Sequence, residues 1–393
     1  MHIIRILTLL IVASLGLQAM SYKQFKAHTL KNSKILKSQT LSLLTTEQEN
    51  NILLRSSNPT LNLEVSNYNA NAGGNNVEYA AGISQTIRTG SYMNGLESKA
   101  YASSLLSKAF RTQGRAGYLK ALEGLYTQYV YQSKMLSLLQ DEYILSLKVT
   151  NMVKERYTSG SENRVAYLQA KTETITLKTQ MYTTKQQRST LYYQLLAIAG
   201  FSKKISLDKR FIYSVSSKTK STSKQSPKQQ ILKAKEKLYQ SDYTMNQSAL
   251  RNYNLYAGIE KEPDQSILRV GLNIPLTIHN DRSEERMLAK LKMQQTQLDK
   301  EQLSINVRSQ KQMIKAAIRE LSNQYSALKT LQTEQQELTS LLQEGYTIAK
   351  GSLFQLMTAK NKLIQTRKAL LQTQKMINDQ KIALRFLQGD YND

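Results

Sequence analysis

One helix break decides the fold, and the chain contains it twice: Tyr157-Thr158-Ser159-Gly160-Ser161 and Tyr346-Thr347-Ile348-Ala349-Lys350-Gly351. The two copies stand at a constant offset (346 − 157 = 189), and no gap is needed between residues 82–200 and residues 271–389. A self-match at one fixed offset is typical of a repeated structural unit. The sequence therefore predicts two copies of one unit, with further pairs at Ala170 and Ala359 and at Gly200 and Gly389.

Each copy contains a very long segment with few helix breakers, residues 91–158 and 283–345. Apolar side chains recur there in steps of three and four, which keeps one seam of a helix facing a partner helix. Sixty-odd helical residues at about 1.5 Å each form a rod of about 100 Å. Shorter helices are expected to return over residues 164–199 and 353–388. A rod of this length needs other segments, or other chains, as packing partners.

Two short regions alternate apolar and polar residues instead, within ~61–88 and ~251–278. Alternation broken by a turn-rich stretch predicts a pair of strands in each region, with brief loops at 69–76 and 261–266. Each strand has roughly ten residues, the length that a tilted strand needs to cross a bilayer.

Four strands cannot span a bilayer alone, because the unpaired N–H and C=O groups at their edges would face hydrocarbon. Two copies of the chain would supply eight strands, and side chains fill a ring of that size. Three copies would supply twelve, which leaves room for a lumen. The apolar seams of the helices also need neighbours, so strands and helices both favour a closed homo-oligomer.

Composition bounds the remaining choices. Residues 1–19 have a cationic start, a short apolar run and small residues up to Ala19, which predicts a secretory signal peptide. No later segment is apolar enough for a membrane-spanning helix. The formal net charge is +25, but the cations are scattered along helical faces, which disfavours nucleic acid as a partner. With no cysteine and three isolated histidines, the chain shows no catalytic, cofactor or metal-binding motif, so we do not expect an enzyme.

These features together resemble the outer-membrane efflux protein family, whose best-known member is TolC. The resemblance covers nearly all of the chain after residue 19 and is carried most clearly by the two break segments, by Val165-Ala166-Tyr167-Leu168-Gln169-Ala170 and by the closing glycines. It implies a mainly α fold with a small β part. As a homotrimer the chain would form a twelve-strand β-barrel in the outer membrane of a diderm bacterium and a twelve-helix α-barrel, a coiled coil, in the periplasm. The implied partners are a periplasmic adaptor (membrane fusion) protein, an inner-membrane pump of the RND or ABC type and outer-membrane lipid.

The resemblance also assigns roles to residues. The two breaks would form the periplasmic tip, where the adaptor docks and the channel closes; the tip residues would be Tyr157, Gly160, Ser161, Glu162, Tyr346, Ala349, Lys350 and Gly351. Gln355 and Thr358 stand where some family members have aperture carboxylates, so an acidic aperture is not expected. Adaptor binding would favour an open packing of the tip helices, and Lys350→Glu is the first substitution that would test this hypothesis.

The expected organisation follows from the repeat and the resemblance. It comprises the signal peptide (1–19), an N-terminal periplasmic helix (20–60), a first repeat (61–200), an equatorial linker (201–227), a second repeat (228–389) that opens with a helix over ~228–248, and a C-terminal tail (390–393). The function predicted is the exit duct of a tripartite efflux or type I secretion system. Two alternatives remain at this point, a periplasmic adaptor and a secreted coiled-coil scaffold, and the sequence does not identify the exported substrate.

Overall fold

The structure is a computed structural model that describes residues 19–69, 75–216, 224–348 and 351–392. It is 72% helical, with one small antiparallel sheet of four strands. This confirms the predicted fold class, mainly α with a small β part. The predicted signal peptide lies outside the described residues except for Ala19.

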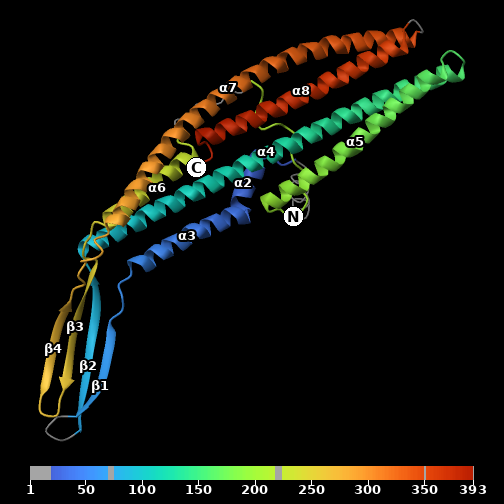
Figure 1. Cartoon of the computed structure of the whole chain (residues 1–393). Helices are drawn as coiled ribbons and strands as arrows, with labels where there is room; N and C mark the ends of the chain where they lie inside the picture. The colour runs from blue at the N-terminus through green and yellow to red at the C-terminus, as the bar shows by residue number, and fades with distance from the viewer. Residues whose placement is uncertain (1–18, 70–74, 217–223, 349–350, 393) are drawn as a thin grey trace, which may run out of the picture. The chain divides into compact units, whose positions relative to one another are not determined.

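The predicted duplication is confirmed by the helices (Figure 1). The long helices α4 (Gly90–Thr158) and α7 (Ser283–Thr347) end 189 residues apart, and the returning helices α5 (Arg164–Ala199) and α8 (Leu353–Gln388) are both 36 residues long. Both returning helices end at a glycine in the left-handed region, Gly200 with φ 74° and Gly389 with φ 76°. Only glycine adopts this conformation without steric cost, which explains why the repeat keeps a glycine at its end.

The chain divides into two compact units, and α4 and α7 contribute to both. The first unit comprises residues 1–37, 114–225 and 307–393, and the second comprises residues 38–113 and 226–306. The largest core of the first unit gathers Phe25, Leu122, Tyr126, Leu195 and Tyr391, all at most 1% exposed. Its apolar residues therefore come from the N-terminal helix, both members of the first hairpin and the C-terminal tail.

The second unit contains the sheet, whose strand order is β1-β2-β3-β4. The strands are β1 (Thr60–Asn69), β2 (Asn75–Arg88), β3 (Asn252–Lys261) and β4 (Ser266–Asn273). All neighbours are antiparallel, and β2 and β3 join the two repeats in one sheet. The last strand ends at Asn273, before the end at ~278 that the alternation predicts. Pro275 explains the difference, because proline has no N–H to donate to a strand ladder.

The N-terminal segment differs from the single helix expected over 20–60. It forms two helices, α2 (Tyr22–Asn32) and α3 (Lys34–Leu54), separated by Ser33. Ser33 has φ −59° and ψ 121°, so it leaves the helical region while its N–H still donates to the Thr29 carbonyl. The helix preceding β3 is α6 (Pro227–Met245), which starts with a capping box at Ser226 and ends three residues earlier than expected.

Candidate functional site: the helix tips and the two faces of the sheet

The first tip is a tight turn between α4 and α5. Gly160 has φ 75°, which places it in the left-handed region. The N–H groups of Ser161 and Glu162 both donate to the carbonyl of Arg156, at 2.8 and 3.1 Å. The side chain of Asn163 then accepts from the N–H of Ala166 and caps α5. The turn is thus closed by its own backbone and directs α5 back along α4.

The two tips of one chain are joined through Tyr346, near the end of α7. Its side chain is 1% exposed and packs in a cluster with Val153, Ala166 and Leu356. Arg156 donates from Nη2 to the Tyr346 carbonyl at 2.7 Å, and its guanidinium lies 4.3 Å from the centre of the Tyr346 ring. The Tyr346 hydroxyl donates to Glu162 at 3.3 Å. We call Arg156, Glu162 and Tyr346 the tip cluster; it ties the end of the second long helix to the first turn.

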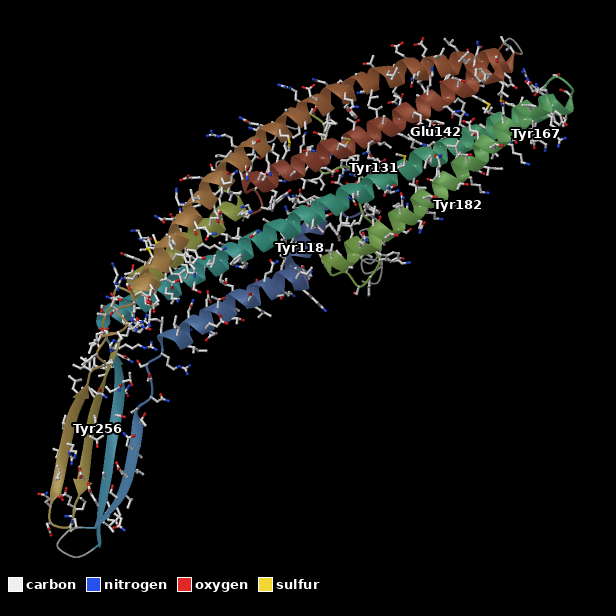
Figure 2. The ribbon with its side chains drawn as sticks, viewed as in Figure 1. Tyr118, Tyr131, Glu142, Tyr167, Tyr182 and Tyr256 are labelled. Atoms are coloured by element: carbon white, nitrogen blue, oxygen red, sulfur yellow. The ribbon has the colours of Figure 1, made fainter. Side chains whose placement is uncertain are left out.

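The equivalent tyrosine of the first repeat behaves differently. Tyr157 is 38% exposed and stacks on Tyr167 of α5, with ring centres 5.8 Å apart and planes at 3° (Tyr167 is labelled in Figure 2). Of the other predicted tip residues, Gly160, Ser161, Glu162 and Gly351 lie in the described turns, whereas Ala349 and Lys350 lie outside the described residues. The predicted role of Lys350 therefore stays a prediction.

Gln355 and Thr358, the predicted aperture residues, both lie on the first turns of α8. Gln355 is exposed, and Thr358 is half-buried and lines a groove of about 660 Å³ between α5 and α8. Val165, Phe354 and Met357 give this groove an apolar wall, and Glu173 contributes the one carboxylate among its lining residues. Gln355 is not among the lining residues, so of the two predicted aperture residues only Thr358 lines this groove.

A polar cluster that sequence reasoning missed lies on the same helices. Glu142 of α4 is 2% exposed on its side chain and accepts from Arg367 of α8 at 2.5 Å (Figure 2). Lys360 is buried on α8, and its ammonium interacts electrostatically with the carboxylates of Glu173 and Glu142. Burial lowers the pKa of the Lys360 ammonium and raises the pKa of the Glu173 carboxyl, each away from its charged form. In the sequence these residues look like ordinary charges on helix surfaces.

A second missed cluster surrounds Glu123 of α4, which is 0% exposed. Its carboxylate accepts from the hydroxyls of Tyr22 at 3.0 Å, Tyr213 at 2.7 Å and Tyr391 at 2.5 Å. Burial raises the pKa of all three tyrosines. Lys26 lies 3.5 Å from the same carboxylate. The cluster joins α2, α4, the linker and the C-terminal tail, and its one sequence signal is a glutamate beside the buried Leu119, Leu122 and Tyr126.

The sheet has two chemically different faces. The register aligns one face of apolar side chains across all four strands, and the exposures of the large ones are high, from 39% at Val77 to 78% at Val270. The opposite face carries polar and small residues. This apolar face consists of Leu61, Leu63, Val65, Val77, Tyr79, Ala81, Ile83, Leu255, Ala257, Ile259, Leu268, Val270 and Leu272.

Tyr256 belongs to the polar face (Figure 2), where it pairs with Ser84 and its ring lies over Gly82 and Gly258. A Cβ at Gly258 would come within 2.3 Å of the Tyr256 hydroxyl oxygen, so these glycines make space for the ring. Tyr79 and Tyr253 lie on the apolar side. Of these three tyrosines, Tyr256 alone therefore lies on the polar face.

Each sheet edge has only one paired side. β1 pairs with β2 alone and β4 with β3 alone, so both outer strands present unpaired backbone groups. In the described part of the chain, no helix is both apolar enough and long enough to cross a bilayer.

Solved structures that share this architecture include outer-membrane channels. The chain matches the outer-membrane channel OprN with a TM-score of 0.80 at 11% identity, over 94% of this chain and 90% of that one. It matches CusC, described in terms of transmembrane channel formation, with a TM-score of 0.77 at 15% identity, over 93% and 91% of the two chains. The outer membrane protein VceC of Vibrio cholerae gives a TM-score of 0.76 at 12% identity, over 93% and 95%.

The chain thus has the fold of these outer-membrane channels over almost its whole length, which is the TolC-type fold that the sequence predicts. Neither a protein-family model nor a curated protein sequence matches it. The likeness is one of fold, at 11–15% identity in these three structures.

Proposed function

We propose that this protein is the outer-membrane exit duct of a tripartite efflux or type I secretion system, a passive conduit and not an enzyme. The observation that carries the proposal is the sheet: one continuous apolar face is exposed, and both sheet edges are open. An apolar face of this kind is stable against lipid, but unpaired edge strands are not. Three copies arranged in a ring would pair β1 of one copy with β4 of the next. The apolar face would then contact lipid and would not be exposed to water.

The fold supports the proposal independently, because OprN is a channel of the outer membrane. By analogy, the helices would extend into the periplasm, and the tip would contact a periplasmic adaptor protein and, through it, an inner-membrane pump of the RND or ABC type. The tip residues of both breaks, including Ala349 and Lys350, would form the docking and closing surface, with Gln355 and Thr358 at the aperture.

The tip cluster supports a specific version of gating. Arg156 and Glu162 hold the end of α7 against the first turn in this structure, so opening would require these contacts to separate. An adaptor that binds only the separated arrangement would shift the population towards it. Lys350→Glu tests the docking part of this idea: adaptor binding and conductance that both stay unchanged would contradict a role for Lys350.

The first experiment is fractionation followed by reconstitution. The mature protein should co-sediment with outer membranes, require detergent for extraction, have the mass of three chains by light scattering, and give discrete conductance steps in a planar bilayer. A stable, water-soluble monomer would contradict the proposal.

A pair of lysine substitutions on β4 tests the orientation of the sheet. Val270 lies on the apolar face and Asn273 on the polar face of the same strand. A lysine facing lipid costs about 2–4 kcal/mol at mid-bilayer. Val270→Lys should therefore reduce membrane assembly strongly, while Asn273→Lys should leave assembly intact; equal effects of the two would contradict a lipid-facing apolar side.

A further inference from the structure

One face of α5 carries an exposed stripe in which apolar and basic residues alternate. The stripe steps by four and three residues, so it forms a single seam of the helix. Leu168, Ile175 and Tyr182 are 46%, 54% and 55% exposed (Tyr182 is labelled in Figure 2). We call this stripe the basic seam; its members are Arg164, Leu168, Lys171, Ile175, Lys178, Tyr182 and Lys185.

The basic seam is not an ordinary solvated face. Large apolar side chains at every seventh residue are the pattern that packs into a partner helix, whereas a solvated face carries polar residues there. The basic residues of the seam form no ion pair with another described residue. Glu173, the one acidic residue of α5, is half-buried and lines the groove towards α8. The seam therefore lacks an acidic partner.

The last part of α7 supplies a complementary stripe. From Thr330 to Thr347 this helix has three glutamates and no lysine or arginine. Leu331, Leu338 and Leu341 are 43%, 50% and 60% exposed, and all three glutamates are exposed. We call this the acidic seam, made of Leu331, Glu334, Glu337, Leu338, Leu341 and Glu344.

The repeat places the two seams at the same distance from the tips. In the first hairpin, Thr150 of α4 bonds to Thr174 of α5 at 2.8 Å, so these residues lie at one level. Thr339 is the counterpart of Thr150 in α7, because 150 + 189 = 339, and it is likewise buried. A copy of α7 laid antiparallel against α5 at equal depth therefore puts Thr339 beside Thr174. Glu334 then lies at the level of Lys178, and Glu344 lies at the level of Lys171.

One chain does not bring its own seams together. The described residues contain no hydrogen bond or ion pair between α5 and α7, and the apolar members of both seams are exposed in the single chain. α8 contacts both α4 and α5, through Arg367 with Glu142 and through Lys368 with Gln180. Both seams thus remain available to a second molecule.

We propose that the basic seam of α5 in one copy docks on the acidic seam of α7 in the next copy, as an antiparallel coiled coil in which Lys178 pairs with Glu334 and Lys171 pairs with Glu344. This proposal rests on the proposed ring of identical chains, and it specifies which helices meet. A heterologous contact of this kind repeats from copy to copy, and it closes into a ring when the rotation between copies is that of the proposed trimer. The opposite charges fix the register and prevent α5 from pairing with another α5.

Charge exchange tests the pairing. Lys171→Glu/Lys178→Glu should raise the concentration at which the detergent-solubilised assembly half-dissociates by about tenfold or more, because the seams then repel. Adding Glu334→Lys/Glu344→Lys in the same chain should restore assembly, because these two glutamates lie opposite Lys178 and Lys171. Lys203→Glu/Lys204→Glu, exposed in the segment after α5, has the same change in charge outside the seam and should have no effect. Circular dichroism should show equal helix content in all four proteins.

Cysteine cross-linking tests the register directly, because the chain has no cysteine of its own. Ile175→Cys combined with Leu338→Cys should give dimers and trimers on oxidation, whereas Tyr101→Cys with Leu338→Cys should give none. A charge reversal that disrupts assembly but is not restored by the exchange would mean that α5 binds another partner, and would overturn the pairing.

The same measurements separate this proposal from the proposed function. If the wild type is trimeric and conducting, but the charge reversals do not change assembly and the cysteine pair does not cross-link, the proposed channel function stands and the proposed pairing of the two seams is refuted. A wild-type protein that is monomeric in detergent refutes both.

Discussion

Arg156→Ala should loosen the tip, because Arg156 makes the strongest contact between the two repeats there. In the present structure its guanidinium donates to the Tyr346 carbonyl at 2.7 Å and lies 4.3 Å from the ring centre of the same residue. Alanine removes both contacts. The backbone turn that closes on the Arg156 carbonyl does not depend on the side chain, so the fold of the hairpin should persist.

The expected loss can be built from these two contacts. A hydrogen bond from a charged group contributes about 1.5–3 kcal/mol, and a cation–π contact at a partly exposed site about 0.5–1 kcal/mol. Arg156 is half-buried, so water compensates for part of the two lost contacts. The net loss of stabilisation at the tip is therefore about 2–3 kcal/mol. Every 1.4 kcal/mol is a factor of ten, so the separated tip should become roughly 30- to 150-fold more populated.

Hydrogen exchange and conductance measure this change separately. The amide of Ile348, which bonds to the Glu344 carbonyl at the end of α7, should exchange roughly 30-fold faster in Arg156→Ala, for an effect near the lower end of this range. The channel should also show a larger mean conductance without adaptor. Lys154→Ala, an exposed change two residues earlier on α4, is the matched control and should have no effect. Tyr346→Phe keeps the ring and loses only the 3.3 Å bond to Glu162, so it should have a small effect. Exchange rates that stay unchanged in Arg156→Ala would contradict the claim that the tip cluster holds the end of α7 against the first turn.

Three further predictions concern stability, each followed by thermal unfolding in detergent. Glu123→Ala removes a fully buried carboxylate and should cost about 3–5 kcal/mol, whereas exposed Glu97→Ala on the same helix should cost less than about 0.5 kcal/mol; similar melting temperatures would contradict this. Burial raises the pKa of Glu173 above its unfolded value, so its carboxyl favours the folded state at low pH and loses that effect as pH rises through the raised pKa. The wild type should therefore gain stability relative to Glu173→Gln between pH 7.5 and pH 5, and a constant difference would count against it. Gly389→Ala should destabilise more than Gly200→Ala, although both positions have positive φ, because the added Cβ would lie 2.5 Å from the Gln225 carbonyl oxygen but 3.4 Å from that of Asn32.

Much of the fold is encoded in local patterns that a reader can find in the sequence. The returning helices begin after Asn163 and Ser352 and end at Gly200 and Gly389, at the residues expected. A left-handed glycine ends each helix, and the Asn163 side chain caps α5, whereas Ser352 forms no side-chain capping bond. The strand alternation is equally local, and it correctly separates the lipid-compatible side from the polar side. The early end of β4 was also readable in Pro275, a residue that cannot continue a ladder.

The polar clusters could not be predicted in the same way, because they depend on residues that are distant in the sequence. Glu123 receives bonds from tyrosines that lie 101, 90 and 268 positions away. Glu142 and Arg367 are 225 positions apart. Periodicity shows which side of a helix is buried, but it does not show which charged residues will meet there, since that depends on how the helices are set against each other.

The tip shows how a duplication of backbone can give an asymmetric contact. Tyr157 and Tyr346 are equivalent in the repeat, yet Tyr157 is 38% exposed and Tyr346 only 1% exposed. The reason lies in their partners. Arg156 and Glu162 hold Tyr346, and their counterparts in the second repeat, 189 residues on, are Gly345 and Gly351. Two glycines cannot hold Tyr157 in return.

Space at the second tip reinforces this asymmetry. A Cβ at Gly351 would lie 2.7 Å from the backbone nitrogen of Tyr346, so that position admits no side chain without a shift of backbone. The second turn is therefore packed closely against the end of α7, and the first turn supplies both charged partners. Because both charged partners of Tyr346 come from one side, a molecule that binds the first turn and engages Arg156 would weaken the attachment of the second turn in a single event. Symmetric turns would have required two such events in each chain.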